Sequence, residues 1–266
     1  MANNISALAS VHPDARLGDN ITIGPFVSIE ADVVIGDNCI IRPHTSILDG
    51  ARIGNNNKIY EGCIIAADPQ DFRWKGEKST VEIGDGNTIR EHVVINRSIH
   101  EGGKTHIGNE NFLMAQSHIG HDSFITNHCV IGNGCKIAGN VRVSHCSILS
   151  SGVIVHEDCN IGPWVMVKGG SRVTGNIPPY VIMAHNPISY FGVNAYLLRR
   201  GHKSDDIIND IAKCYRHIYQ SNTSIFNAVR RIKEDVSPSR ERDAILAFIE
   251  NQHNKIVATP LGADEI

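Results

Sequence analysis

Apolar residues recur at every sixth position along most of this chain. From Ile5 to Val173 this position is aliphatic each time, except at Asp71, Glu77 and Glu101. A period of six fits neither an α-helix nor an alternating strand, but it is typical of hexapeptide repeats that wind into a parallel β-helix. Three repeats close one triangular coil, so residues 18 positions apart lie one above the other. A sandwich of short strands, the alternative, would not keep this phase through two interruptions.

A second fixed slot lies four positions after the aliphatic one and holds small residues. Alanine and serine occupy it in several repeats, and five cysteines occupy it in others: Cys39, Cys63, Cys129, Cys135 and Cys159. Free cysteine behaves as a small buried hydrophobe, and the sequence contains no C-x-x-C pair. We therefore expect buried thiols here, not disulfides or metal ligands.

Two polar segments interrupt the repeat, at residues 66–78 and 97–105. The repeat returns in the same phase after each of them, which predicts loops extruded from a corner while the coil continues beneath. Loops on a rigid scaffold often carry function. The first loop holds Asp71, Arg73, Trp74 and Lys75 close together.

The pattern changes to a helical period after the proline-containing stretch 174–187, and the tail from Val257 shows no pattern. We predict a mainly β fold, with a parallel β-helix over residues 1–178 and a small C-terminal α-helical domain over residues 179–266. Capping residues and apolar spacing predict four helices: Asn194 to Arg200, one that begins after the N-cap Ser204, Ser224 to Glu234, and one after Ser237-Pro238.

Charge is nearly balanced, with 25 Lys and Arg against 28 Asp and Glu, and aromatic residues make up only 6%. Nucleic-acid-binding proteins usually carry a basic excess or stacking aromatics, so no nucleic-acid partner is expected. The N-terminus lacks the features of a secretory signal, and no apolar run approaches the ~20 residues that span a bilayer. These features predict an intracellular protein without a transmembrane segment.

The densest group of side chains able to transfer protons is His118-Ile119-Gly120-His121-Asp122. Counted from Ile119, His121 falls at a polar slot that points outward, and a histidine beside a carboxylate suits general-base catalysis. Two other interpretations stay open at this point. A non-catalytic scaffold would carry these histidines on its surface, and a zinc site could draw its ligands from His100, His106, His118, His121 and His128.

The sequence also contains several longer and more specific segments, among them PQDFRWKGE, NFLMAQSHIGHD, VTGNIPPYVI and FGVN followed by LLRRG. With them the chain resembles, over nearly its whole length, the UDP-N-acetylglucosamine O-acyltransferases of lipid A biosynthesis. The resemblance implies a left-handed β-helix and a homotrimer with active sites between subunits. It also implies a cytoplasmic enzyme that moves a 3-hydroxyacyl chain from acyl carrier protein to the 3-position of the glucosamine ring of UDP-N-acetylglucosamine, the first step of lipid A biosynthesis.

The resemblance also implies roles for individual residues. His121 matches the general base, Asp122 the carboxylate that supports it, and His118 a histidine of the same pocket. Gly139 matches a glycine whose backbone N–H polarises the thioester carbonyl. The implied transfer is direct, without a metal, a covalent enzyme intermediate or any cofactor beyond the phosphopantetheine of the carrier protein.

Substrate-binding positions follow from the same resemblance: Asp71, Arg73, His118, His156, Asn194 and Arg200. Gly169 matches a position where bulk limits acyl length, so its lack of a side chain implies room for a long chain. The acidic carrier protein needs a positive landing area, which basic residues of the C-terminal half could provide: Lys136, Arg142, Lys168, Arg172, Arg199, Arg200 and Lys203.

The sequence departs from the family pattern near these positions. Asn140 and Asn96 stand where the family usually has histidine, Glu157 where glutamine is typical, and the segment 194–200 is one residue shorter. Two alternatives follow for the acyltransferase interpretation: a different acceptor, such as a 3-amino sugar nucleotide, or a different donor. A zinc enzyme like the γ-class carbonic anhydrases, which share the repeat, is a further alternative.

Overall fold

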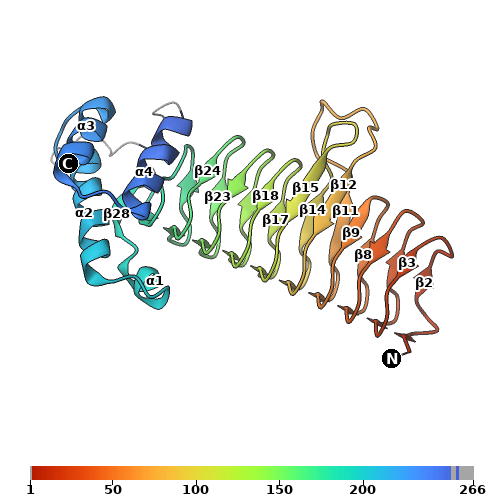
Figure 1. The fold of residues 1–266 in the computed structure, drawn as a ribbon. Helices are drawn as coiled ribbons and strands as arrows, with labels where there is room; N and C mark the ends of the chain where they lie inside the picture. Colours follow the sequence, from red (N-terminus) through yellow and green to blue (C-terminus); the bar gives the residue numbers. More distant parts are fainter. Residues whose placement is uncertain (1, 253–255, 258–266) are drawn as a thin grey trace.

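A computed structural model describes residues 2–252 and 256–257 of the chain. The chain winds into a triangular, left-handed parallel β-helix with a group of helices at its C-terminal end (Figure 1). The predicted fold class is confirmed. Beyond Val257, the predicted patternless tail lies outside the described residues.

Three sheets form the sides of the triangle, and each strand pairs with strands one coil before and after it. Sheet A contains β1 (Asn4–Ile5), β4 (Thr22–Ile23), β7 (Ile40–Ile41), β10 (Lys58–Ile59), β13 (Thr88–Ile89), β16 (Phe112–Leu113), β19 (Val130–Ile131), β22 (Ile148–Leu149), β25 (Met166–Val167), β27 (Val181–Ala184) and β28 (Ser189–Val193). Sheet B contains β2 (Ser10–Val11), β5 (Ser28–Ile29), β8 (Ser46–Ile47), β11 (Ile64–Ala67), β14 (Val94–Asn96), β17 (His118–Ile119), β20 (Lys136–Ile137), β23 (Ile154–Val155) and β26 (Arg172–Val173). Sheet C contains β3 (Arg16–Leu17), β6 (Val34–Ile35), β9 (Ala51–Ile53), β12 (Thr80–Ile83), β15 (Lys104–Ile107), β18 (Phe124–Ile125), β21 (Arg142–Val143) and β24 (Asn160–Ile161).

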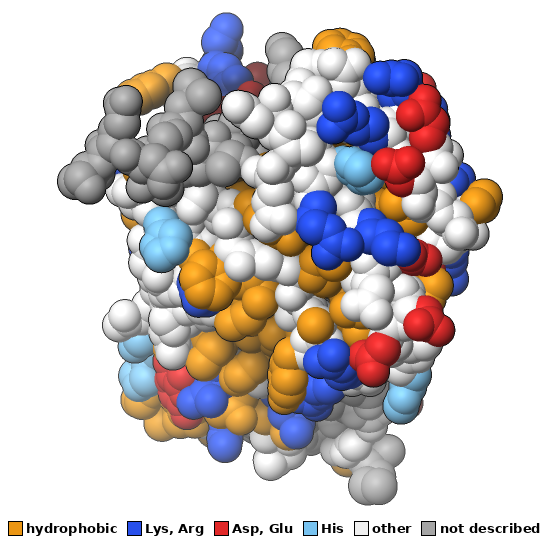
Figure 2. Space-filling view, turned by 90° about the vertical axis from the view of Figure 1, so that its left-hand side faces the viewer, with side chains coloured by type: hydrophobic (Ala, Val, Ile, Leu, Met, Phe, Trp, Pro, Cys, Tyr) orange, Lys and Arg blue, Asp and Glu red, His pale blue; other side chains and the backbone are white. Residues whose placement is uncertain are grey.

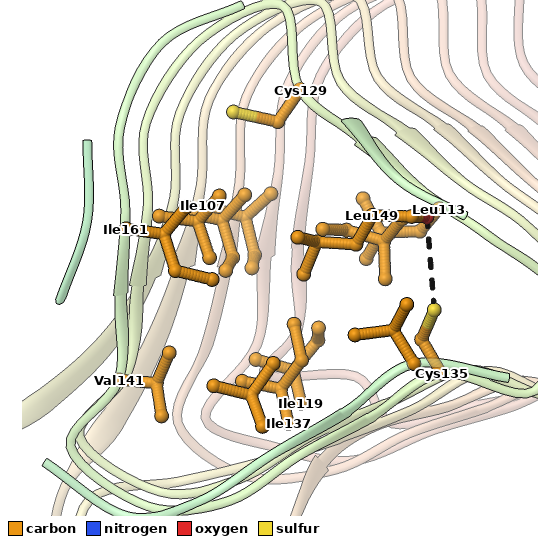
Figure 3. Packing of buried hydrophobic residues seen from close by; sticks show 14 of the residues in the cluster. Ile107, Leu113, Ile119, Cys129, Cys135, Ile137, Val141, Leu149 and Ile161 are labelled. Carbon is orange, nitrogen blue, oxygen red and sulfur yellow. Dashed lines mark hydrogen bonds between the residues drawn. The ribbon is translucent and has the colours of Figure 1, made fainter. Parts of the chain in front are cut away.

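The six-residue repeat becomes a core of three aliphatic ladders. In sheet B, Ile119 pairs with Ile95 on one side and Ile137 on the other, and all three are fully buried. Figure 3 shows the three ladders facing one another across the inside of the coil. Each such side chain contributes about 1.5–3 kcal/mol by leaving water, so the stacking of coils is the main source of stability.

The slot four positions after the aliphatic residue is buried, as the five cysteines predicted: each of them is a free thiol with at most 3% exposure. The expectation that this slot requires a small residue was too narrow, because Asn57, Asn87 and Asn111 also occupy it. The amide of Asn87 donates to Asn57 Oδ1 at 3.0 Å and to the Gly108 carbonyl at 2.9 Å. The amides thus satisfy backbone groups between coils.

Both interruptions of the repeat leave the coil at the same edge, where a strand of sheet B turns into the next strand of sheet C. We call this edge the B–C corner. The first loop runs from 68 to 79, between β11 and β12, and the second from 97 to 103, between β14 and β15. Each is slightly shorter than its predicted range because residues 66–67 extend β11 and residues 104–105 begin β15. Both loops project from the body of the β-helix in Figure 1.

At the C-terminal end the four predicted helices are present: α1 (Ala195–Arg200), α2 (Asp205–Tyr219), α3 (Ile225–Asp235) and α4 (Arg240–Asn251). Ser204 caps α2 by accepting a bond from the Ile207 N–H, as expected. The division into two domains at residue 178 stays a prediction; strand pairing of sheet A continues past that point through β27 and β28. Among the described helices, none has the length and apolar content needed to cross a bilayer.

Candidate active site

The B–C corner carries most of the residues that the sequence singled out. Successive turns at this corner hold the 68–79 loop, the 97–103 loop, His121-Asp122, Gly139-Asn140 and His156-Glu157. Because the coil repeats every 18 residues, Gly139 and Glu157 follow His121 one and two coils further on. The scaffold therefore lines up side chains that are far apart in the sequence.

His121 lies between two carboxylates. Its Nδ1 atom is 2.8 Å from Oδ2 of Asp122, and its Nε2 atom is 3.3 Å from Oδ2 of Asp71. The residue is only 7% exposed. One ring nitrogen is thus fixed by a neighbour in the same turn, while the other faces the side chain of an extruded loop.

Hydrogen bonds hold Asp122 in place from both sides. Its carboxylate accepts from the Ser98 hydroxyl and, at 3.2 Å, from the Ile99 N–H, and its own N–H donates to Thr105 Oγ1 at 2.8 Å. Burial alone would raise the pKa of the Asp122 carboxyl, but the bonds from Ser98, His121 and Ile99 outweigh burial and lower this pKa. Asp122 therefore stays ionised and can orient the His121 ring.

The 97–103 loop is the part of this support that sequence reasoning missed. It was recognised as an extruded loop, but Ser98, Ile99 and Thr105 were given no role. No motif marks them, because their contact with Asp122 arises from the stacking of two coils.

Gly139 lies directly against the His121 ring. A Cβ atom on Gly139 would be 2.3 Å from both Nε2 and Cε1 of His121, far inside contact distance. Within the described part of the chain, the Gly139 N–H donates to no acceptor. At this position a side chain would collide with the His121 ring, and the backbone N–H is available as a donor beside that ring.

Arg73 connects the extruded loop to the coil two turns beyond His121. Its Nη2 atom is 2.6 Å from Oδ2 of Asp71 and 2.5 Å from Oε1 of Glu157. The hydrogen bonds from Arg73 hold the pKa of the Asp71 carboxyl well below its usual range. Bonds to Asp71 and then Glu157 raise the pKa of the Arg73 guanidinium. The sequence marked Glu157 as a departure from the family but gave no sign of this ion pair.

His118 lies on β17, one strand position before the turn that carries His121. Its Nε2 atom is 2.6 Å from Oδ1 of Asn96, and burial, followed by the charges of Lys136 and His121, lowers the pKa of its imidazole. His118 also borders a hollow of about 370 Å³ on the outer face of sheet B. The hollow is lined by Gln70, His92, Val94, Gln116, Ser117, His118 and Lys136.

Of the remaining predicted site residues, His156 shares the B–C corner and the other three do not. His156 is exposed at the B–C corner, but Gly169 follows β25 at the corner between sheets A and B. Asn194 is buried, and its amide donates to the Trp164 carbonyl at 2.9 Å, at the corner between sheets C and A. Arg200 lies over the Tyr196 ring on α1. A single chain therefore does not bring Gly169, Asn194 or Arg200 to His121.

A grouping with metal-ligand character also occurs at the B–C corner. Ligand atoms of Asp71, His121 and Glu157 all lie within 4.8 Å of one another. The Arg73 guanidinium lies against both carboxylates and supplies the balancing positive charge, so we assign no metal here. The five histidines of the zinc interpretation do not form one cluster. His128, for example, pairs with Glu110 at the corner between sheets C and A.

Comparisons with known proteins decide the family. The model of domain 2 of UDP-N-acetylglucosamine O-acyltransferase matches residues 176–257, and the model of bacterial transferase hexapeptides matches residues 14–48, 32–67 and 104–139. The acyl-[acyl-carrier-protein]–UDP-N-acetylglucosamine O-acyltransferase of Halorhodospira halophila is 38% identical over 94% of this chain and 97% of its own length. That of Ectopseudomonas mendocina is 40% identical over 92% and 97%. The chain belongs to the UDP-N-acetylglucosamine O-acyltransferase family.

Solved structures of this family agree with the fold. The Bacteroides fragilis UDP-N-acetylglucosamine acyltransferase LpxA matches with a TM-score of 0.93 and 45% identity, over 95% of this chain and 99% of that one. The Francisella novicida UDP-N-acetylglucosamine acyltransferase matches with a TM-score of 0.92 and 33% identity, over 97% and 95%. The family resemblance predicted from the sequence segments is confirmed.

Two departures from the family pattern have definite partners in this structure. Asn140 donates through Nδ2 to Oδ1 of Asp158 at 2.6 Å, and Asn96 bonds His118 on one side and the Asp68 carbonyl on the other. Asn96 therefore fixes His118, and Asn140 fixes Asp158 in the next turn of the B–C corner.

Proposed function

We propose that this chain transfers a 3-hydroxyacyl chain from acyl carrier protein to the 3-position of the glucosamine ring of UDP-N-acetylglucosamine, the first step of lipid A biosynthesis. The observation that supports this most directly is the arrangement of His121 between Asp122 and Gly139. It joins a base, a carboxylate that orients it and a backbone donor at one point, as acyl transfer to a hydroxyl requires.

In the proposed reaction, His121 Nε2 accepts the proton of the sugar hydroxyl while the hydroxyl oxygen attacks the thioester carbon. Asp122 accepts the Nδ1–H bond, so it keeps the lone pair on Nε2 and then stabilises the imidazolium. The Gly139 N–H donates to the oxygen that becomes negative; loss of one such donor typically lowers kcat by about 10²–10³-fold. The imidazolium finally returns its proton to the departing thiolate, so no cofactor is consumed.

We propose a homotrimer with the active site between subunits. Gly169 and Asn194 belong to the expected site but lie at other corners of the triangle than His121, and Arg200 lies on α1. A neighbouring subunit could bring its own corners to the B–C corner. The outer column of sheet A supports such contact, because it carries consecutive half-buried apolar residues at its C-terminal half: Phe112, Val130, Ile148, Met166 and Ile182.

The carrier protein, which we expect to be acidic, would dock at the C-terminal end. Figure 2 shows basic side chains beside an apolar patch on this face. Arg199 and Arg200 are both exposed on α1, and Arg199 Nε lies 3.0 Å from Oδ1 of Asp205. Lys203 is less exposed and is paired with Glu241 at 2.5 Å. Lys136 and Arg172 lie on sheet B and Arg142 on sheet C, so the seven basic residues named from the sequence do not form one patch. We assign the landing area to the Arg199 and Arg200 pair.

We also propose that the enzyme acts in the cytoplasm. All seven cysteines are free thiols, and Cys146 alone among them is not fully buried. Thiols persist in a reducing compartment.

The test is to incubate the purified protein with UDP-N-acetylglucosamine and a panel of acyl carrier proteins that differ in chain length, and to identify products by mass spectrometry. An ester-linked product is expected from the native protein, and none from His121→Ala with an unchanged oligomeric state. An amide product formed only from a 3-amino sugar nucleotide would favour the altered acceptor instead. Loss of activity with a chelator, together with stoichiometric zinc, would favour the metal alternative.

A further inference from the structure

The outer nitrogen of His121 is closed off in this structure. Asp71 Oδ2 lies 3.3 Å from Nε2, the atom that must accept a proton in the proposed function. Asp71 thus occupies the space beside Nε2 that the sugar hydroxyl must enter. In the closed arrangement the hydroxyl therefore cannot reach the ring nitrogen.

A bridge across the site holds Asp71 in this place. Arg73 Nε is 2.9 Å from Oδ1 of Asp71, and the Arg73 backbone N–H donates to the same oxygen at 2.7 Å. The far end of the guanidinium reaches Glu157 at 2.5 Å. Sheet B runs from β11, which precedes the loop, through β14, β17 and β20 to β23, which precedes Glu157. At about 4.8 Å per strand, β11 and β23 lie roughly 19 Å apart, and the turns that carry His121 and Gly139 lie between them.

We propose that Glu157 is a positioning residue. Its ion pair with Arg73, which we call the strap, holds the 68–79 loop over His121. The diphosphate of a sugar nucleotide opens the strap by binding Arg73 in place of Glu157. The inference rests on the proposed function. A guanidinium forms paired hydrogen bonds with phosphate oxygens as readily as with carboxylates. When Arg73 turns to the phosphates, Asp71 loses its anchor and Nε2 becomes accessible to the hydroxyl of the same substrate.

The strap thus couples binding of the nucleotide to exposure of the base. An empty site holds His121 capped, so a stray hydroxyl, water included, finds no base to activate it. This coupling lowers the affinity for the sugar nucleotide, because part of the binding free energy is used to open the bridge.

The decisive variant is Glu157→Gln, which keeps the size of the side chain and removes its charge. It leaves Arg73 in place, whereas Arg73→Ala would also remove the phosphate partner and could not separate the two roles. We expect the KM for UDP-N-acetylglucosamine and the Kd for UDP, measured by calorimetry, to fall about two- to fivefold, the range that an exposed ion pair contributes. The kcat should stay unchanged, since the strap is open in the substrate complex.

Asp158→Asn is the matched control, because it removes one negative charge from the adjacent exposed position without touching Arg73. It should leave KM and Kd as in the native protein. An unchanged or raised KM in Glu157→Gln, or an equal effect in Asp158→Asn, would overturn the strap. If the native protein binds UDP but forms no product with any acyl donor, the proposed function fails instead. The Kd values for UDP of the native protein and Glu157→Gln would then still test the strap.

Discussion

The backbone of Gly139 lies so close to the imidazole of His121 that a single added methyl group would reach within 2.3 Å of Nε2 and Cε1. The two residues are 18 positions apart, one coil of the β-helix, and their contact places an available N–H beside the base. His121 is also fixed at its other nitrogen by Asp122 at 2.8 Å. The ring therefore has little room to move away.

We expect Gly139→Ala to lower kcat by about 10²-fold or more, because the new methyl group must displace either the ring or the oxyanion donor. The control is Gly175→Ala, two coils further along the same corner. There an added Cβ meets only Val257 Cγ2, at an ordinary 3.4 Å. Steady-state kinetics and size-exclusion chromatography of both variants check this; equal activity of the two would contradict the assigned role of Gly139.

The pH dependence of the rate should report one histidine and no carboxylate. Hydrogen bonds lower the pKa values of both Asp71 and Asp122. Interactions of a carboxyl with a depressed pKa are fully present above its unfolded value of about 3.9, and are lost only as pH falls through the lower folded value. Both groups therefore stay ionised where histidines titrate, between about pH 5 and 8.

Measured from pH 4.5 to 9, log kcat/KM should accordingly fall on the acid side with a slope of one. A slope of two, or a plateau that extends below pH 5, would show that another group supplies the base. The His118→Ala variant serves as the control, and its acid limb should persist because the limb belongs to a different histidine.

Ile148→Asp should dissociate the proposed trimer. Ile148 is half-buried at the outer face of β22, in the middle of the apolar column of sheet A. A carboxylate placed in an apolar contact would lose its hydration without gaining a partner, which costs several kcal/mol. Analytical ultracentrifugation should find monomers and assays should find no activity.

Thr22→Asp provides the matched control, since Thr22 is exposed at the polar end of the same column. It should leave the oligomeric state unchanged. A trimer that survives Ile148→Asp would place the subunit contact on another face of the triangle.

Ile59→Ala should destabilise the β-helix by about 2–5 kcal/mol, the cost of removing a fully buried aliphatic side chain from a packed core. Lys58→Ala, at the neighbouring outward position of β10, should change the unfolding free energy by less than about 0.5 kcal/mol. Denaturant unfolding followed by circular dichroism compares the two. Similar midpoints would mean that the ladder at Ile59 contributes little.

The sequence by itself determined the scaffold and pointed to His121 as the candidate base. An aliphatic residue that must face inward every six positions leaves one way to bury them all, so the coil, its phase and its extruded loops could be predicted. The buried cysteines followed from the same rule, whereas capping residues and helical apolar spacing predicted α2, α3 and α4. His121 and Asp122 were found because they are neighbours in the chain as well as in space.

Tertiary structure alone decided how the site is held. The bonds from Ser98 and Ile99 to Asp122 and the ion pair of Arg73 with Glu157 join residues 23 or more positions apart. Each depends on which side chains stack at one corner and on where an extruded loop folds back. The six-residue repeat constrains inward positions, where a misplaced side chain would disrupt the core. Outward positions at a corner are free to vary, and their partners emerge only when the coils are stacked.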